Sequence, residues 1–263
     1  MLAGCPAPDD PDMNADSTSA SSGAAGSSGS ASPATTTAAN DESSAGEDSA
    51  STSDGPDSGG SSGGTPGGSN DTDTMLAIGD SVLEWNAERG ASIPEVAGEL
   101  AGLAVTNASV SGAMLLEDEE SIPSQYQPSD WEWVLVNGGA NDVGDGCGCG
   151  DCVGQVDAII SADVGDGAMV ELIDRIEADG AGIVLLGYYD IPPGEFSDCD
   201  EEFAILHERY AQLASQRPAV LYVSMGDAID PLADPETLDE DQIHPSVQGS
   251  AAIGALIAER IQP

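Results

Sequence analysis

The sequence predicts an α/β fold in which a parallel sheet of about five strands is covered by helices on both faces. Short apolar runs alternate along the chain with longer segments that carry apolar residues at every third or fourth position. The apolar runs do not alternate with polar residues, so each strand is expected to be buried on both faces. That pattern is typical of parallel sheets with helices on either side.

The expected elements follow in order from residue 75. Residues 75–78 form an apolar run that stops at Gly79, as a buried parallel strand does. Residues 93–103 have helical spacing, and Pro94 suits a first helical turn because an N–H has no partner there. The expected series is completed by strands at 103–107, 133–137, 182–188 and 220–223, and by helices at 155–160, 167–178, 201–215 and 247–261.

The chain divides into two parts of different composition. Residues 1–73 are mostly small and polar and contain no aromatic residue. Such a segment cannot bury enough apolar surface to offset the entropy of ordering, so we expect a disordered, acidic Ser/Gly-rich tether. Residues 74–263 are long enough to form one domain with a sizeable core.

Cys5 ends the run Leu-Ala-Gly-Cys, which resembles the lipobox of bacterial lipoproteins, where the cysteine is lipidated. The charged and apolar segments of a signal peptide do not precede it in this sequence, so a start upstream of Met1 and a chance likeness are both open. We favour the lipoprotein, because the tether suits a protein held off a membrane. The expected protein is a monomer in an extracytoplasmic location, membrane-anchored or secreted.

The charge balance excludes several classes of partner. The chain has 48 acidic residues against five arginines and no lysine, and its formal net charge is −43. Nucleic acid and anionic membrane surfaces are repelled by such a field, so neither is expected to bind. We interpret the charge as an adaptation to solubility or salt, and a specific cation-binding role is the less favoured alternative. No calcium-loop pattern is present, and no cofactor or metal is expected.

Four further cysteines lie in the expected domain: Cys147, Cys149, Cys152 and Cys199. An exported protein would pair them as two disulfides, with Cys199 bonded to one of the first three, because a Cys147–Cys149 bond would be strained. A four-thiolate zinc site is the alternative, since Cys-x-Cys-x-x-Cys and one distant cysteine can supply tetrahedral ligands. We favour the disulfides, because export and zinc thiolates seldom occur together.

Polar residues or glycine follow three of the expected strands. Ser81 follows the first, Gly112 the second and Asn141 the third. The ligand crevice of a parallel sheet lies beyond the carboxyl ends of its strands, so these three residues are expected to meet there. Each also has a purely structural explanation: Ser81 as a helix N-cap, and Gly112 and Asn141 as turn residues.

The two histidines differ in their surroundings. His244 stands three residues after Asp241, and this spacing allows a carboxylate to hold the imidazole in one tautomer. Asp239 and Glu240 lie close enough in sequence to compete for that role. His207 lies in an expected helix, and we expect it on the solvated side with a structural role.

Together these stretches resemble the four blocks of the SGNH/GDSL hydrolase family in order, neighbours and spacing, over residues 75–263. The first block is Gly-Asp-Ser ending at Ser81, and the last is Asp-x-x-His ending at His244. The resemblance implies a three-layer α/β/α, flavodoxin-like fold. Val82 stands where the family has leucine, which is a conservative change, and the cysteine-rich loop is an addition to the family pattern.

The resemblance also implies the chemistry, which is hydrolysis of carboxylic esters by a serine esterase or lipase through an acyl-enzyme on Ser81. Ser81 and Gly112 would donate backbone N–H groups, and Asn141 its side chain, to the oxyanion. His244 would be the base and Asp241 its partner. Small-molecule, glycan or lipid esters are the expected substrates, and neutral esters are favoured by the negative field. The alternative function is a surface-tethered glycan- or ligand-binding module on an inactive hydrolase scaffold.

Overall fold

The structure is a computed structural model that describes residues 74–117, 119–150, 152–194, 196 and 198–262. The expected tether over residues 1–73, including Cys5, lies outside these residues. In the part of the chain that is described, no helix combines the length and apolar character needed to cross a bilayer.

A five-stranded sheet forms the centre of the domain, in the order β2-β1-β3-β4-β5. All neighbouring strands are parallel, and Leu76 of β1 lies opposite Thr106 on one side and Val134 on the other. The strand order is that of flavodoxin-like folds, so the predicted fold class is confirmed. The strands are β1 (Thr74–Ile78), β2 (Ala104–Asn107), β3 (Trp133–Val136), β4 (Gly182–Gly187) and β5 (Val220–Ser224).

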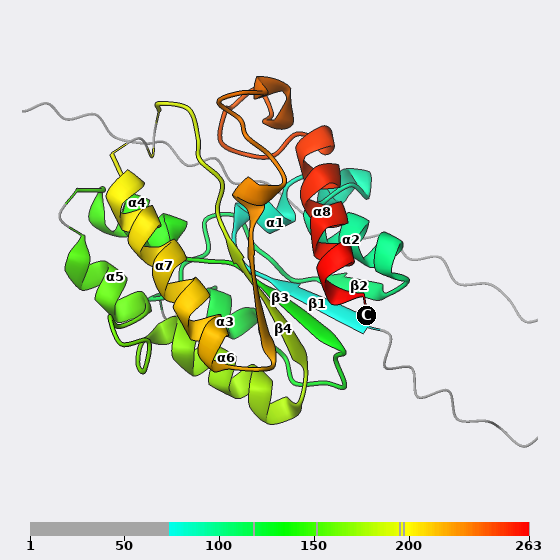
Figure 1. Cartoon of the computed structure of the whole chain (residues 1–263), viewed down its shortest axis with the longest axis horizontal. Helices are drawn as coiled ribbons and strands as arrows, with labels where there is room; N and C mark the ends of the chain where they lie inside the picture. The colour runs from blue at the N-terminus through cyan, green and yellow to red at the C-terminus, as the bar shows by residue number, and fades with distance from the viewer. Residues whose placement is uncertain (1–73, 118, 151, 195, 197, 263) are drawn as a thin grey trace, which may run out of the picture. The chain divides into compact units, whose positions relative to one another are not determined.

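Helices cover both faces of the sheet, as Figure 1 shows. Leu76 and Ile78 pack with one set of helices, and their neighbours Met75 and Ala77 pack with the other. Strand residues therefore alternate between two apolar cores. The helices on the first face are α5 (Val153–Ile159), α6 (Ala168–Asp179) and α7 (Asp200–Gln216), and those on the second are α2 (Ile93–Ala101) and α8 (Val247–Ile261).

The ends of α2 show why the sequence starts and stops a helix there. Ser92 and Glu95 form a capping box at its beginning, and Pro94 occupies the first turn. Gly102 ends the helix in the left-handed conformation with φ 78°, which a side chain would disfavour. The helix is two residues shorter than the sequence predicts, because this glycine cap precedes Leu103.

Three helices of the described chain are not among those that the sequence predicts. Helices α1 (Ser81–Glu84) and α3 (Ile122–Gln125) have four residues each, too few to show a helical period. Helix α4 (Ala140–Cys147) contains Gly144 and Gly146, which lower its helix propensity. The described chain also has 3₁₀ turns at Ala87–Arg89, Met225–Asp227 and Pro235–Thr237. Helices α1 and α4 matter most here, because they begin at the carboxyl ends of β1 and β3.

Candidate active site

Ser81 and His244 meet at the carboxyl edge of the sheet, although 163 residues separate them in the chain. Ser81 is the first residue of α1, and its Oγ lies 2.8 Å from Nε2 of His244. The N-cap of α1 is Asp80, whose carboxylate accepts a hydrogen bond from the Val82 N–H. Ser81 is therefore not the capping residue, and its hydroxyl contacts the imidazole.

Asp241 holds the other side of the His244 ring. Its Oδ2 lies 2.7 Å from Nδ1 of His244, while its Oδ1 accepts hydrogen bonds from the backbone N–H groups of Ile243 and His244. Burial alone would raise the pKa of Asp241, but these hydrogen bonds from His244 and Ile243 outweigh it and lower the pKa. The carboxylate therefore stays charged and fixes the tautomer in which Nε2 can accept a proton from Ser81.

Trp85 is a neighbour of His244 that the sequence did not reveal. The two rings are stacked with centroids 4.0 Å apart and an angle of 8° between their planes. The indole Nε1–H donates a 3.0 Å hydrogen bond to Asp239. The sequence left Asp239 open as an alternative to Asp241 for the carboxylate that orients His244. Trp85 also caps the C-terminus of α1. A closed ring of contacts thus links Ser81, α1, Trp85, Asp239 and His244.

The candidate oxyanion donors lie after β2 and β3. Asn141 is in the first turn of α4 with 8% exposure, and its Nδ2 donates a 3.0 Å hydrogen bond to the Ala113 carbonyl. One amide hydrogen remains for a ligand. Gly112 precedes Ala113, is exposed, and has φ 77°, a backbone conformation that explains the glycine. Asn141 thus reaches the Gly112 turn through the Ala113 carbonyl, while Gly112 stays outside the lining of the cavity beside Ser81.

A buried network of hydrogen bonds surrounds Asp80, the residue that precedes Ser81. Asp80 accepts hydrogen bonds from the Tyr188 hydroxyl, from Nδ2 of Asn137 and from the Val82 N–H. Burial raises the pKa of Asp80 even though these hydrogen bonds oppose it. Gly79 is required here, because a Cβ would collide with the Asn137 side chain. The sequence offered no signal for this network, since its members come from three different strand ends.

A cavity of about 190 Å³ opens beside Ser81. Polar groups line one part of it, and apolar and aromatic side chains line the rest. The polar lining includes Ser81, Asn141 and His244, and the aromatic lining includes Tyr188, Phe196 and Phe203.

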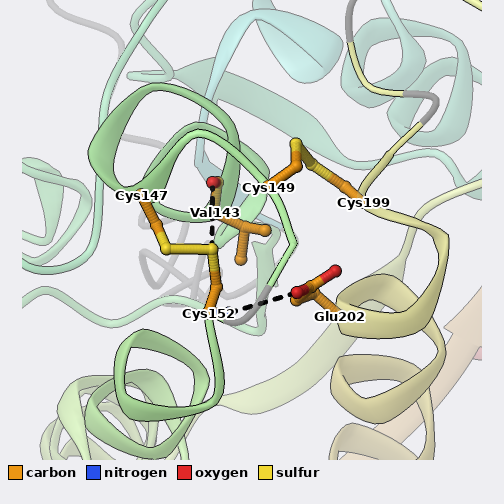
Figure 2. Close-up of a disulfide and its surroundings, with 6 residues drawn as sticks. All are labelled: Val143, Cys147, Cys149, Cys152, Cys199 and Glu202. Carbon is orange, nitrogen blue, oxygen red and sulfur yellow. Dashed lines mark hydrogen bonds between the residues drawn. A yellow bond between two sulfur atoms is a disulfide. The ribbon is translucent and has the colours of Figure 1, made fainter. Parts of the chain in front are cut away.

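The four cysteines of the domain form two disulfides next to the end of α4, Cys147–Cys152 and Cys149–Cys199 (Figure 2). The disulfide prediction is confirmed, including a bond from Cys199 to one of the first three cysteines, and no thiolates remain for zinc. Cys152 N–H also donates to the buried Glu202 of α7. Within the described ranges, no group of three or more His, Cys, Asp or Glu side chains is arranged to hold a metal ion.

His207 does not lie on the solvated side of its helix, where the sequence predicts it. The side chain is partly buried on α7, and its Nε2 has no hydrogen-bond partner among the described residues. Burial lowers its pKa despite the nearby Asp190. The prediction of a solvated side was wrong, because the helix turns this residue toward the segment after β4. His207 lies outside the lining of the cavity beside Ser81.

Known proteins share this fold. A G-D-S-L family lipolytic protein from Desulfitobacterium hafniense matches with TM-score 0.56 and 13% identity over 72% of this chain and 99% of that chain. An aryl esterase from M. smegmatis matches with TM-score 0.52 and 15% identity over 72% and 97%. An acetyl-xylooligosaccharide esterase from Geobacillus matches with TM-score 0.53 and 19% identity over 72% and 94%. No curated protein sequence matches the chain.

The sequence itself matches a protein-family model. Residues 77–252 match the model of the GDSL-like Lipase/Acylhydrolase family. The matched range includes the Gly-Asp-Ser block at one end and the Asp-x-x-His block at the other. The chain therefore belongs to the GDSL-like Lipase/Acylhydrolase family, a family of ester hydrolases.

Proposed function

We propose that this protein is a serine esterase that forms an acyl-enzyme on Ser81. The observation that carries the proposal is the chain of contacts from Ser81 Oγ to His244 Nε2 and from His244 Nδ1 to Asp241. A serine hydroxyl is a weak nucleophile unless an adjacent base removes its proton, and this arrangement supplies the base and the group that orients it.

The reaction has two steps. Ser81 Oγ attacks the ester carbonyl carbon while His244 takes the hydroxyl proton, and His244 then returns this proton to the departing alcohol. In the second step, His244 takes a proton from a water molecule as the water oxygen attacks the acyl carbon. The bond from that carbon to Ser81 Oγ then breaks, His244 returns the proton to Oγ, and the acid leaves. The Ser81 N–H and the free amide hydrogen of Asn141, two residues that line the cavity, stabilise the oxyanion in both steps. The third donor that we propose is the Gly112 N–H, on the turn that Asn141 contacts through the Ala113 carbonyl.

The substrates that we propose are neutral esters of small alcohols or sugars. An ester that carries an anionic group would be repelled by a chain of net charge −43, whereas a neutral ester would not. The solved structures that share the fold include an aryl esterase and an acetyl-xylooligosaccharide esterase, and the second name is that of an esterase for an acetylated sugar.

Hydrolysis of p-nitrophenyl acetate tests the proposed function. Ser81→Ala and His244→Ala should each lower kcat by about 10³-fold or more, because each removes part of one catalytic unit. His207→Ala is the matched control, since it removes the other histidine and should leave the rate unchanged. Wild-type protein that gives no turnover, or turnover that survives in Ser81→Ala, would favour the alternative of a binding module on an inactive scaffold.

We also propose that the protein is exported as a monomeric lipoprotein attached through Cys5. Two disulfides in the domain support export, because disulfides persist in oxidising compartments. In the source cells, the protein should sediment with membranes, and mass spectrometry should detect a lipidated Cys5. An unmodified Cys5 in soluble protein would contradict the attachment.

A further inference from the structure

The cavity beside Ser81 has an aromatic wall. Phe196 and Phe203 lie with ring centroids 6.1 Å apart, and Tyr188 and Phe203 lie 5.7 Å apart. All three rings line the cavity that also exposes Ser81 and His244. Such a wall binds hydrocarbon better than it binds a polyol, because burial of apolar surface is favourable and the rings offer few hydrogen-bonding groups.

The size of the cavity limits the hydrocarbon that fits. A cavity of about 150 Å³ holds one benzene ring, so the 190 Å³ here leaves room for about seven or eight heavy atoms. The ester group itself occupies part of this space. A short acyl chain therefore fits inside the cavity, and a long fatty acyl chain would have to extend beyond it.

Phe196 is held in place by its packing and by a disulfide. Its ring packs against Gly144 of α4, where a Cβ would collide with the ring. The Phe196 carbonyl accepts a 3.0 Å hydrogen bond from the N–H of Cys199. Cys199 is in turn bonded to Cys149, which follows α4, and Figure 2 shows this disulfide joining the two segments. The second disulfide, Cys147–Cys152, closes only a short loop next to α4 and does not reach the Phe196 segment.

We propose that Phe196, held against α4 by the Cys149–Cys199 disulfide, closes the acyl end of the cavity and restricts the enzyme to esters of short-chain acids. This inference rests on the proposed function. It assigns a specificity role to the one disulfide that connects the aromatic wall to the helix carrying Asn141.

The test compares kcat/KM for p-nitrophenyl acetate and p-nitrophenyl decanoate, which differ only in the acyl chain. Wild-type protein should prefer acetate. Phe196→Ala should raise the decanoate-to-acetate ratio on the order of tenfold, since it opens the end of the cavity. The double variant Cys149→Ala/Cys199→Ala should raise the ratio in the same direction, because it frees the segment that carries Phe196.

The matched control is Cys147→Ala/Cys152→Ala, which removes a disulfide and should leave the ratio unchanged. An unchanged ratio in Phe196→Ala, or an equal rise in both disulfide variants, would overturn the inference. If circular dichroism shows that a cysteine variant is unfolded, the inference is tested by the decanoate-to-acetate ratios of Phe196→Ala and Phe196→Leu. Acetate hydrolysis that still depends on Ser81 would then preserve the proposed function while this inference fails.

Discussion

At the scale of single residues, the environment of His244 depends on side chains that are distant in sequence. Asp241 contacts one edge of the ring, and Trp85 covers one face. Trp85 could not be identified as a neighbour from the sequence, since 159 residues separate it from His244 and only the fold joins them. Asp241 could be identified, because a turn of three residues is a local feature.

Trp85 should contribute to turnover by keeping His244 oriented and by stabilising its protonated form through a cation–π contact. Trp85→Ala is expected to lower kcat/KM for p-nitrophenyl acetate about tenfold. Trp85→Phe keeps a stacked ring but loses the hydrogen bond to Asp239. Its kcat/KM should therefore lie between the values for wild type and for the alanine variant. Equal rates in all three proteins would show that the stack has no part in catalysis.

At the scale of elements, the sequence predicts the strands that are continuous apolar runs and the helices whose apolar residues recur with helical spacing. The apolar runs of β1 and β4 and the spacing of α8 were located well, and α8 spans residues 247–261 as expected. The short α1 and the glycine-containing α4 could not be found in this way, because tertiary packing stabilises them rather than their own propensity. Both helices carry candidate site residues, so the catalytic edge was the least predictable part of the fold.

Helices α2 and α8 pack closely because glycine lies between them. A Cβ at Gly254 of α8 would lie 2.7 Å from the Cβ and Cγ1 of Val96 on α2. Gly254→Ala should therefore lower the free energy of unfolding by about 1–3 kcal/mol through overpacking. Urea denaturation followed by circular dichroism measures this change.

Gly154 provides the matched control on α5, since no atom lies within 4 Å of a Cβ added there. Gly154→Ala should raise the free energy of unfolding by about 0.5–1 kcal/mol, because alanine loses less backbone entropy in a helix. A loss of stability at Gly154 as large as that at Gly254 would mean that helix packing is not the cause.

At the scale of the whole molecule, repulsion between carboxylates opposes folding. The chain has five arginines and 48 acidic residues. One of these arginines, Arg217, forms ion pairs with two carboxylates, those of Asp174 and Glu177. Most carboxylates can therefore have no cationic partner. The free energy of unfolding should rise as NaCl increases from about 0.01 M to 1 M, because the screening length falls from about 30 Å to 3 Å.

Tetramethylammonium chloride separates screening from specific ion binding in this experiment. Its large cation should stabilise the protein about as much as sodium at equal ionic strength. Stabilisation by sodium alone would instead indicate a bound cation.

The span of 163 residues between Ser81 and His244 has a consequence for biosynthesis. A ribosome adding about 5–20 residues per second needs roughly 10–30 s to reach the histidine after it has made the serine. During that interval the nascent chain holds the serine without the histidine. The contact between the two side chains therefore forms only after residue 244 has been made, and a chain that stops before this residue lacks it.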